Sequence, residues 1–193
     1  MAISLSNNYP KSNHDFVKTH SSETINLKKF RQNGQIHIYK SVYRGSFSSI
    51  ISDSLRNAAL GRKVLLVQFM KGGVKQGVAN AVKICGNLTW VRSSHSFDQF
   101  HSEEIENNKS LKKSINESTY ELWNYCKNEL LSGEKDQIIL DEIFLAIKMK
   151  IIDKDDLIST LENRFIPGDV ILTGTDIPKD LLLMANQITE LRS

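Results

Sequence analysis

The 193-residue sequence is poor in cysteine, with only Cys85 and Cys126. These two residues are far apart and show neither a Cys-x-x-Cys nor a Cys/His spacing, so the sequence predicts neither a disulfide framework nor a zinc site. Unpaired cysteines of this kind are typical of reduced thiols in a cytosolic protein. We therefore expect a reducing compartment.

Long apolar runs are also missing. No stretch approaches the roughly 18 residues that a membrane-spanning helix needs. The first residues, MAISLSNNYPKSNHDF, contain no apolar segment of signal-peptide length. We therefore predict a cytoplasmic protein without a membrane partner.

Glycine is scarce, with ten residues in 193, about 5% where about 7% is usual. The shortfall matters because phosphate-binding loops depend on glycine. Apolar residues at 40% and charged residues at 24% nevertheless fit a globular domain. The chain is also long enough to bury a sizeable core.

Positive charge is concentrated at the N-terminus. Residues 1–34 carry five basic and two acidic side chains, which is the whole net charge of +3, and the rest of the chain is neutral. We interpret residues 1–34 as a basic, polar and mobile N-terminal arm, and residues 35–193 as a single α/β domain. A basic pI that comes from the arm alone does not favour a nucleic-acid-binding body.

Hydrophobic patterns from residue 35 onward alternate between strands and helices. We expect strands at 35–39, 64–70, 88–91, 137–142, 169–174 and 188–191, and helices at 46–60, 117–131 and 153–163. A short helical pattern also reaches residue 84, and residues 93–116 are expected to be a loop or a frayed helix. The run VLLVQFM at 64–70 lacks alternation, as in a strand buried on both faces. The sequence therefore predicts a three-layer α/β fold, with a mostly parallel sheet flanked by helices.

The turn between the first strand and the first helix is where a phosphate-binding loop would lie. Such a loop needs glycines for a wrapped backbone, a lysine for the β- and γ-phosphates and a hydroxyl for the metal. Here the turn offers a smaller set: Gly45, the hydroxyls of Ser46, Ser48 and Ser49, and the cations Lys40 and Arg44. The motif does not match, and an ordinary strand–helix turn is the alternative.

Two other predicted strand ends carry charged groups. Asp141 and Glu142 follow the apolar run at 138–140, as in a Walker B element, where a carboxylate can hold Mg²⁺ through water and a second one orients a reacting group. The alternative is that both acids cap the next helix. Lys71 follows the strand at 64–70 and precedes two glycines, so it is a candidate phosphate ligand. Ligands bind outside the carboxyl ends of such strands.

The order of these motifs resembles one known family. The segments GRKVLLVQFMKG (61–72), IILDEI (138–143), DVILTG (169–174) and ITELR (188–192) resemble the P-loop-type ATP:corrinoid adenosyltransferases. The resemblance implies a P-loop NTPase-like (RecA-like) fold. It also implies transfer of the 5′-deoxyadenosyl group of ATP to cob(I)alamin, with ATP, Mg²⁺ and a reduced corrinoid as the bound species. Members of the family are usually homodimers.

Family roles transfer to individual residues of this sequence. The resemblance places nucleotide and phosphate binding on Arg44, Gly45, Ser46, Ser48 and Lys71, and Mg²⁺ binding on Asp141 and Glu142. No residue is assigned as catalytic.

The sequence departs from the family pattern in several places. Ser46 stands where the family has its P-loop lysine, Phe47 where it has a threonine, and Ser41 and Tyr43 where it has glycines. Further along the chain, an apolar pair, Phe144-Leu145, and Thr175 replace a polar-aromatic pair and a common arginine. The chain is thus either an adenosyltransferase with an unusual phosphate loop, or a catalytically silent relative that binds a nucleotide, a corrinoid or a protein.

Overall fold

The computed structural model describes residues 34–45, 47–73, 75–95, 108–165 and 167–191. The predicted N-terminal arm, apart from Gly34, lies outside these residues, as does Ser46 of the predicted phosphate loop. In the described part of the chain, no helix is both long and apolar enough to cross a membrane.

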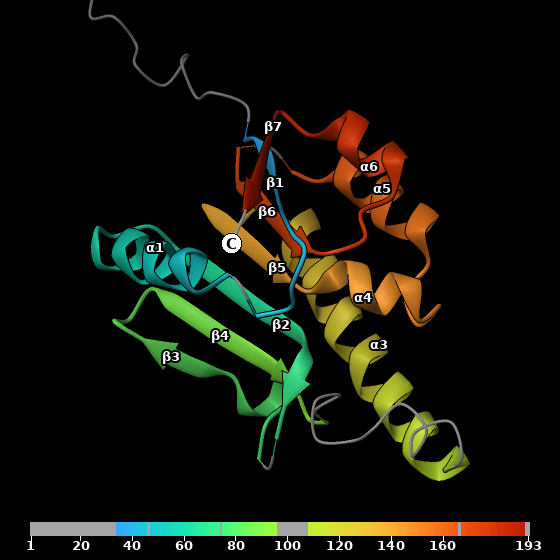
Figure 1. The fold of residues 1–193 in the computed structure, drawn as a ribbon. Helices are drawn as coiled ribbons and strands as arrows, with labels where there is room; N and C mark the ends of the chain where they lie inside the picture. The colour runs from blue at the N-terminus through green and yellow to red at the C-terminus, as the bar shows by residue number, and fades with distance from the viewer. Residues whose placement is uncertain (1–33, 46, 74, 96–107, 166, 192–193) are drawn as a thin grey trace, which may run out of the picture. The chain divides into compact units, whose positions relative to one another are not determined.

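The described residues form a seven-stranded sheet in the order β3-β4-β2-β5-β6-β1-β7 (Figure 1). Its strands are β1 (Ile36–Ser41), β2 (Val64–Gly72), β3 (Val82–Ile84), β4 (Leu88–Ser93), β5 (Gln137–Asp141), β6 (Asp169–Gly174) and β7 (Gln187–Leu191). All neighbouring strands are parallel except β3 and β4, which pair antiparallel. The predicted, mostly parallel sheet is confirmed.

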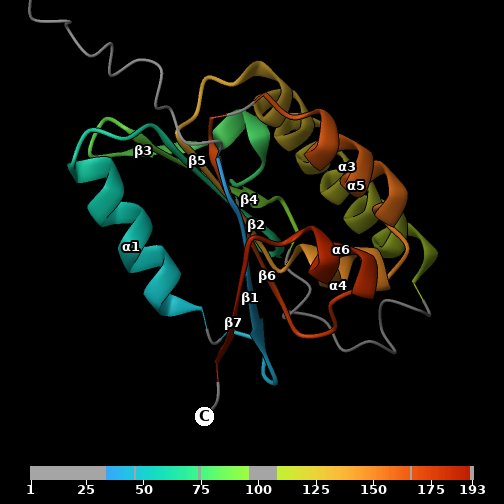
Figure 2. The same cartoon turned by 90° about the horizontal axis from the view of Figure 1, so that it is seen from above.

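Helices cover both faces of the sheet, as Figure 2 shows. Helix α1 (Ser48–Ala59) lies on one face. The opposite face carries α3 (Lys109–Ser132), α4 (Ile143–Lys148), α5 (Lys154–Asn163) and α6 (Lys179–Met184). The predicted three-layer fold is thus confirmed.

Strand β2 contributes side chains to both hydrophobic cores. Its residues Val64 to Met70 are all buried. Because successive side chains of a strand point to opposite faces, Leu65 and Val67 join the core under α3 to α6, whereas Leu66 joins Phe47 in the core under α1. Burial on both faces accounts for the unbroken apolar run.

One expectation about secondary structure was wrong, and a second concerns a stretch that is described only in part. The helical pattern up to residue 84 is instead a short 3-10 turn, η2 (Val78–Asn80), followed by strand β3. Cross-strand pairing of Val82 with Trp90 and of Ile84 with Leu88 outweighs the local helical pattern. Of the stretch 93–116, expected to be a loop or a frayed helix, residues 96–107 lie outside the described residues, and residues 109–116 are helical. Helix α3 begins at Lys109, where the Asn108 side chain accepts a hydrogen bond from the Leu111 backbone N–H.

Close packing at the end of β6 requires a glycine. A Cβ atom at Gly174 would lie 2.7 Å from Cδ2 and 3.0 Å from Cβ of Phe144. Phe144 is 1% exposed, so its ring has little room to move away. Gly174 thereby allows α4 to pack directly against the end of β6.

We predict that Gly174→Ala lowers the free energy of unfolding by about 1–3 kcal/mol, the usual cost of overpacking a core. Urea denaturation followed by circular dichroism measures the change. Gly73→Ala is the matched control, because the nearest atom to its added Cβ would lie 3.8 Å away. Equal losses for the two variants would contradict the packing argument.

Candidate functional site

Two buried carboxylates lie where β5 ends. Asp141 is the last residue of the strand, Glu142 follows it, and each is 2% exposed. Glu142 has φ +61°, a left-handed conformation that side chains other than glycine rarely adopt. Its backbone N–H donates to Thr173 Oγ1 at 3.0 Å, which anchors this turn to β6. Such strain persists only where the surrounding structure holds it, and it concentrates at functional sites.

Asp141 accepts hydrogen bonds from both neighbouring strands. Thr173 Oγ1 of β6 donates to Oδ1 at 2.7 Å, and Gln68 Nε2 of β2 donates to Oδ2 at 2.8 Å. Gln68 lies directly beside Asp141 in the β2–β5 register. Lys71 Nζ lies 3.2 Å from the same Oδ2. The buried carboxylate is therefore both hydrogen-bonded and charge-paired, which burial of a charge requires.

Glu142 is held by two cations. Arg44, in the turn after β1, donates to Oε2 from Nη2 at 2.6 Å and from Nε at 3.2 Å. Lys71 Nζ lies 3.3 Å from Oε1, which is buried and receives no well-aligned hydrogen bond from the described residues. Arg44 and Lys71 are 33% and 25% exposed. One side of each cation thus faces solvent while the other contacts the acidic pair.

The structure brings four of the predicted site residues together: Arg44, Lys71, Asp141 and Glu142. Gly45 and Ser48 make no hydrogen bond or ion pair with them in the described part of the chain. Gly45 has φ +78° and open space around its Cβ position, so a turn conformation alone requires this glycine. Ser48 begins α1. The binding roles of all these residues stay predictions.

Two large side chains replace small residues of the predicted phosphate loop. Phe47 is 2% exposed and packs in the core under α1 with Ile50 and Leu66. Tyr43, by contrast, is 62% exposed. Its ring is therefore not packed into a buried phosphate cradle.

The acidic pair was predicted to bind Mg²⁺, and carboxylate oxygens are suitable ligands. In the described arrangement, however, both oxygens of Asp141 and Oε2 of Glu142 already accept hydrogen bonds. Lys71 Nζ, moreover, contacts both carboxylates. A directly bound ion would have to displace Lys71 or Arg44, and the described residues contain no group of three or more His, Cys, Asp or Glu side chains placed to hold a metal. The residues therefore do not fit a directly bound Mg²⁺ in this arrangement.

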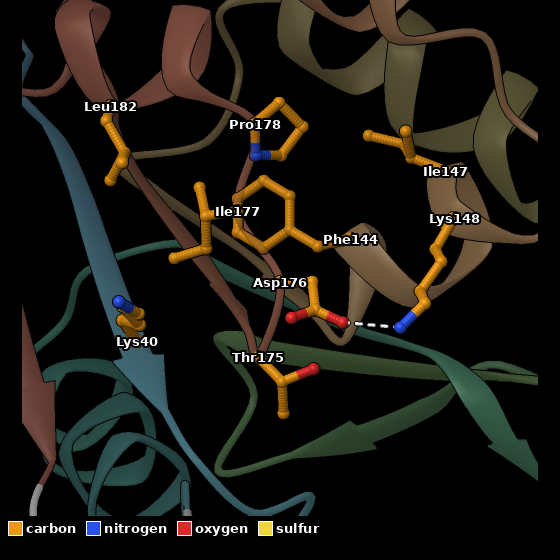
Figure 3. Close-up of a pocket in the computed structure, with 9 residues that line it drawn as sticks. All are labelled: Lys40, Phe144, Ile147, Lys148, Thr175, Asp176, Ile177, Pro178 and Leu182. Carbon is orange, nitrogen blue, oxygen red and sulfur yellow. Dashed lines mark hydrogen bonds and ion pairs between the residues drawn. The ribbon is translucent and has the colours of Figure 1, made fainter.

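A pocket of about 510 Å³ lies at the ends of β1 and β6 (Figure 3). Its walls are mainly apolar, formed by Phe144, Ile147, Ile177, Pro178 and Leu182, and its polar residues are Lys40, Lys148, Thr175 and Asp176. Lys148 Nζ and Asp176 Oδ2 form an ion pair at 2.5 Å. Phe144 and Thr175 are two of the positions at which the sequence departs from the family pattern.

Sequence reasoning missed Gln68 and Thr173 as partners of Asp141. Gln68 Oε1 accepts hydrogen bonds from Trp90 Nε1 at 3.0 Å and from Arg92 Nε at 2.8 Å, which directs its Nε2 toward Asp141. The sequence did offer one signal for Gln68, namely a polar amide side chain within an otherwise apolar strand that was expected to be buried. Thr173 was visible only as part of a strand-ending turn.

A mostly parallel sheet, a basic turn after the first strand and an acidic pair at the end of β5 define a P-loop NTPase-like α/β protein. The family model of ATP:corrinoid adenosyltransferase BtuR/CobO/CobP matches residues 32–193. The chain belongs to this family.

Individual relatives are distant. The chain is 24% identical over 169 residues to the corrinoid adenosyltransferase of Escherichia coli K12, covering 83% of this chain and 78% of that protein. It is 23% identical over 161 residues to the corrinoid adenosyltransferase CobA of Salmonella typhimurium, with the same coverage. An uncharacterized protein of Nostoc, all2391, is 25% identical over 188 residues, which cover 88% of this chain. This chain spans only 46% of that protein's length.

We predict that Thr173→Val lowers the free energy of unfolding by about 1–3 kcal/mol, because it removes a donor to buried Asp141 and the acceptor for the Glu142 N–H. Thermal and urea denaturation at neutral pH measure the loss. Thr175→Val is the matched control, since no side-chain hydrogen bond ties Thr175 to the described residues. Equal stability of both variants would show that Thr173 does not support the acidic pair.

Proposed function

We propose that the protein binds ATP at the carboxyl edge of its sheet and transfers the 5′-deoxyadenosyl group to the cobalt of cob(I)alamin. One observation carries the proposal. Arg44 and Lys71 converge on the buried Asp141–Glu142 pair, at the sheet edge where α/β proteins bind their ligands. Membership of the corrinoid adenosyltransferase family supports adenosyl transfer as the reaction at this site.

Arg44 and Lys71 are the groups that would bind the polyphosphate. Both are partly exposed, so each can meet a ligand from solvent. The planar guanidinium of Arg44 matches two phosphate oxygens at once, whereas the Lys71 ammonium acts as a point charge. Because the family's P-loop lysine position is Ser46, these two cations would supply the charge that the lysine otherwise gives.

The reaction places charge where these cations lie. Cobalt(I) provides the electron pair for the new cobalt–carbon bond at C5′, and the C5′–O bond breaks as triphosphate leaves with its electrons. Negative charge grows on the leaving phosphate oxygen, so a fixed cation beside it lowers the barrier. Lys71 contacts both carboxylates, which hold its ammonium group in place.

The pocket in Figure 3 supports binding of a flat ring next to the phosphate site. Its volume of about 510 Å³ falls within the range of small-molecule sites. Its apolar walls suit the adenine of the nucleotide, and Lys40 and Thr175 offer polar contacts at its margin.

A catalytically silent relative is the second candidate. Two observations favour it. Arg44 of the predicted phosphate loop is paired with Glu142, and Phe47 of the same loop is buried in the core, so both side chains make contacts within the protein. Such a protein would bind a nucleotide, a corrinoid or a protein without turnover.

We predict that the full chain, given Mg-ATP and chemically reduced cobalamin, forms a cobalt–carbon bond, seen as a change in visible absorbance. Lys71→Gln should lower kcat/KM by about tenfold or more, through loss of a charge-assisted contact. Lys83→Gln, on the exposed β3 strand, should leave it unchanged.

Calorimetry with ATP separates the two candidates. Heat of ATP binding without turnover would support the silent relative. If the protein shows no heat of binding and no turnover, both the adenosyltransferase and a silent nucleotide-binding relative are overturned. Lys71→Arg keeps the charge beside the acidic pair, so it should fold and retain part of the activity if Lys71→Gln is unstable.

A further inference from the structure

A second pocket lies at the antiparallel edge of the sheet. It has a volume of about 360 Å³ and is lined by residues before and within η2, by β3 and by β4: chiefly Lys75, Gln76, Asn80, Val82, Trp90 and Arg92. It shares no lining residue with the pocket of Figure 3, so it is a separate cavity that the proposed function does not use.

The pocket carries positive charge without an acid. Its described lining includes Lys75 and Arg92 but no Asp or Glu. Arg92 donates its Nε to Gln68, and its guanidinium lies over the Trp90 ring with Cζ 4.6 Å from the centroid. Its terminal nitrogens form no hydrogen bond or ion pair with the described residues, and neither does the Lys75 ammonium. Two cations that face a cavity in this way favour an anion.

The other walls of the pocket fit a flat ring with a hydrogen-bond donor. Val82 is 56% exposed, and the partly buried Trp90 lines the pocket beside it, so apolar surface is available to a ligand. Gln76 Oε1 is a buried acceptor that no donor among the described residues satisfies. An unsatisfied buried acceptor is costly unless a partner reaches it.

We propose that this pocket binds a small organic anion that carries a flat ring with an N–H donor, of the kind represented by a purine mononucleotide. The anionic group pairs with Arg92 and Lys75, the ring packs against Val82 and Trp90, and the N–H donates to Gln76 Oε1. The proposal does not depend on adenosyl transfer.

The pocket is also connected to the acidic pair. Trp90 and Arg92 both donate to Gln68 Oε1, and Gln68 Nε2 donates to Asp141. An anion that draws Arg92 toward itself weakens one of the two bonds that fix the Gln68 amide. Occupancy of the pocket therefore acts on the site through a single side chain.

The test uses adenosine monophosphate (AMP) as the probe with the full chain and no metal. Tryptophan fluorescence should change on titration, because Trp90 lines the pocket, while the chain's other tryptophan, Trp123, is 1% exposed under another core. Arg92→Gln should weaken binding by about tenfold or more. Lys83→Gln removes the same charge from an exposed neighbouring strand and should bind as the parent does.

Further variants make each outcome decisive. If Arg92→Gln does not fold, Lys75→Gln replaces it, since Lys75 is exposed and its side chain forms no hydrogen bond or ion pair with the described residues. Loss of AMP binding in Arg44→Gln but not in Arg92→Gln would place the nucleotide at the phosphate-loop turn and overturn the proposal. Inorganic phosphate that binds as tightly as AMP would overturn the role of the ring. No response at millimolar AMP would overturn the site altogether.

Discussion

Neutralisation of two buried carboxylates is the constraint on which this structure depends. Removing a charge from water costs on the order of several kcal/mol unless partners replace the lost hydration. Asp141 and Glu142 are each 2% exposed, so their partners have to come from the protein. The end of β2 supplies Lys71 and the turn after β1 supplies Arg44, which ties two segments distant in the chain to the end of β5.

The need to neutralise these carboxylates also affects the predicted phosphate loop, whose sequence differs from the family pattern. Without the family's P-loop lysine, the position of Ser46 offers no charge, and Phe47 has joined the core. Arg44 is still present in this turn, and its guanidinium donates a hydrogen bond to Glu142. A phosphate that binds at this turn would therefore compete with Glu142 for the Arg44 guanidinium.

The sequence was sufficient for the general architecture and for part of the site. The unbroken apolar run of β2 indicates a strand buried on both faces. Ligands bind outside the carboxyl ends of parallel strands, which is why Lys71, Asp141 and Glu142 were predicted as site residues. Strand β3 could not be predicted, because Val82 is set by its pairing with Trp90 and not by local preference. Gln68 was missed because its role depends on register and on an amide orientation that only its partners define.

The Gln68 amide shows why the acidic pair also needs cations. Its Oε1 accepts from Trp90 and Arg92, so only Nε2 is left for Asp141, and the orientation of the amide follows from these donors. An amide donates a hydrogen bond but carries no charge, so Gln68 and Thr173 satisfy the oxygens of Asp141 without neutralising it. Lys71 is the cation that contacts both carboxylates in the described structure. A ligand that draws Lys71 away must therefore leave compensating positive charge behind, or the acidic pair would hold an unpaired charge away from water.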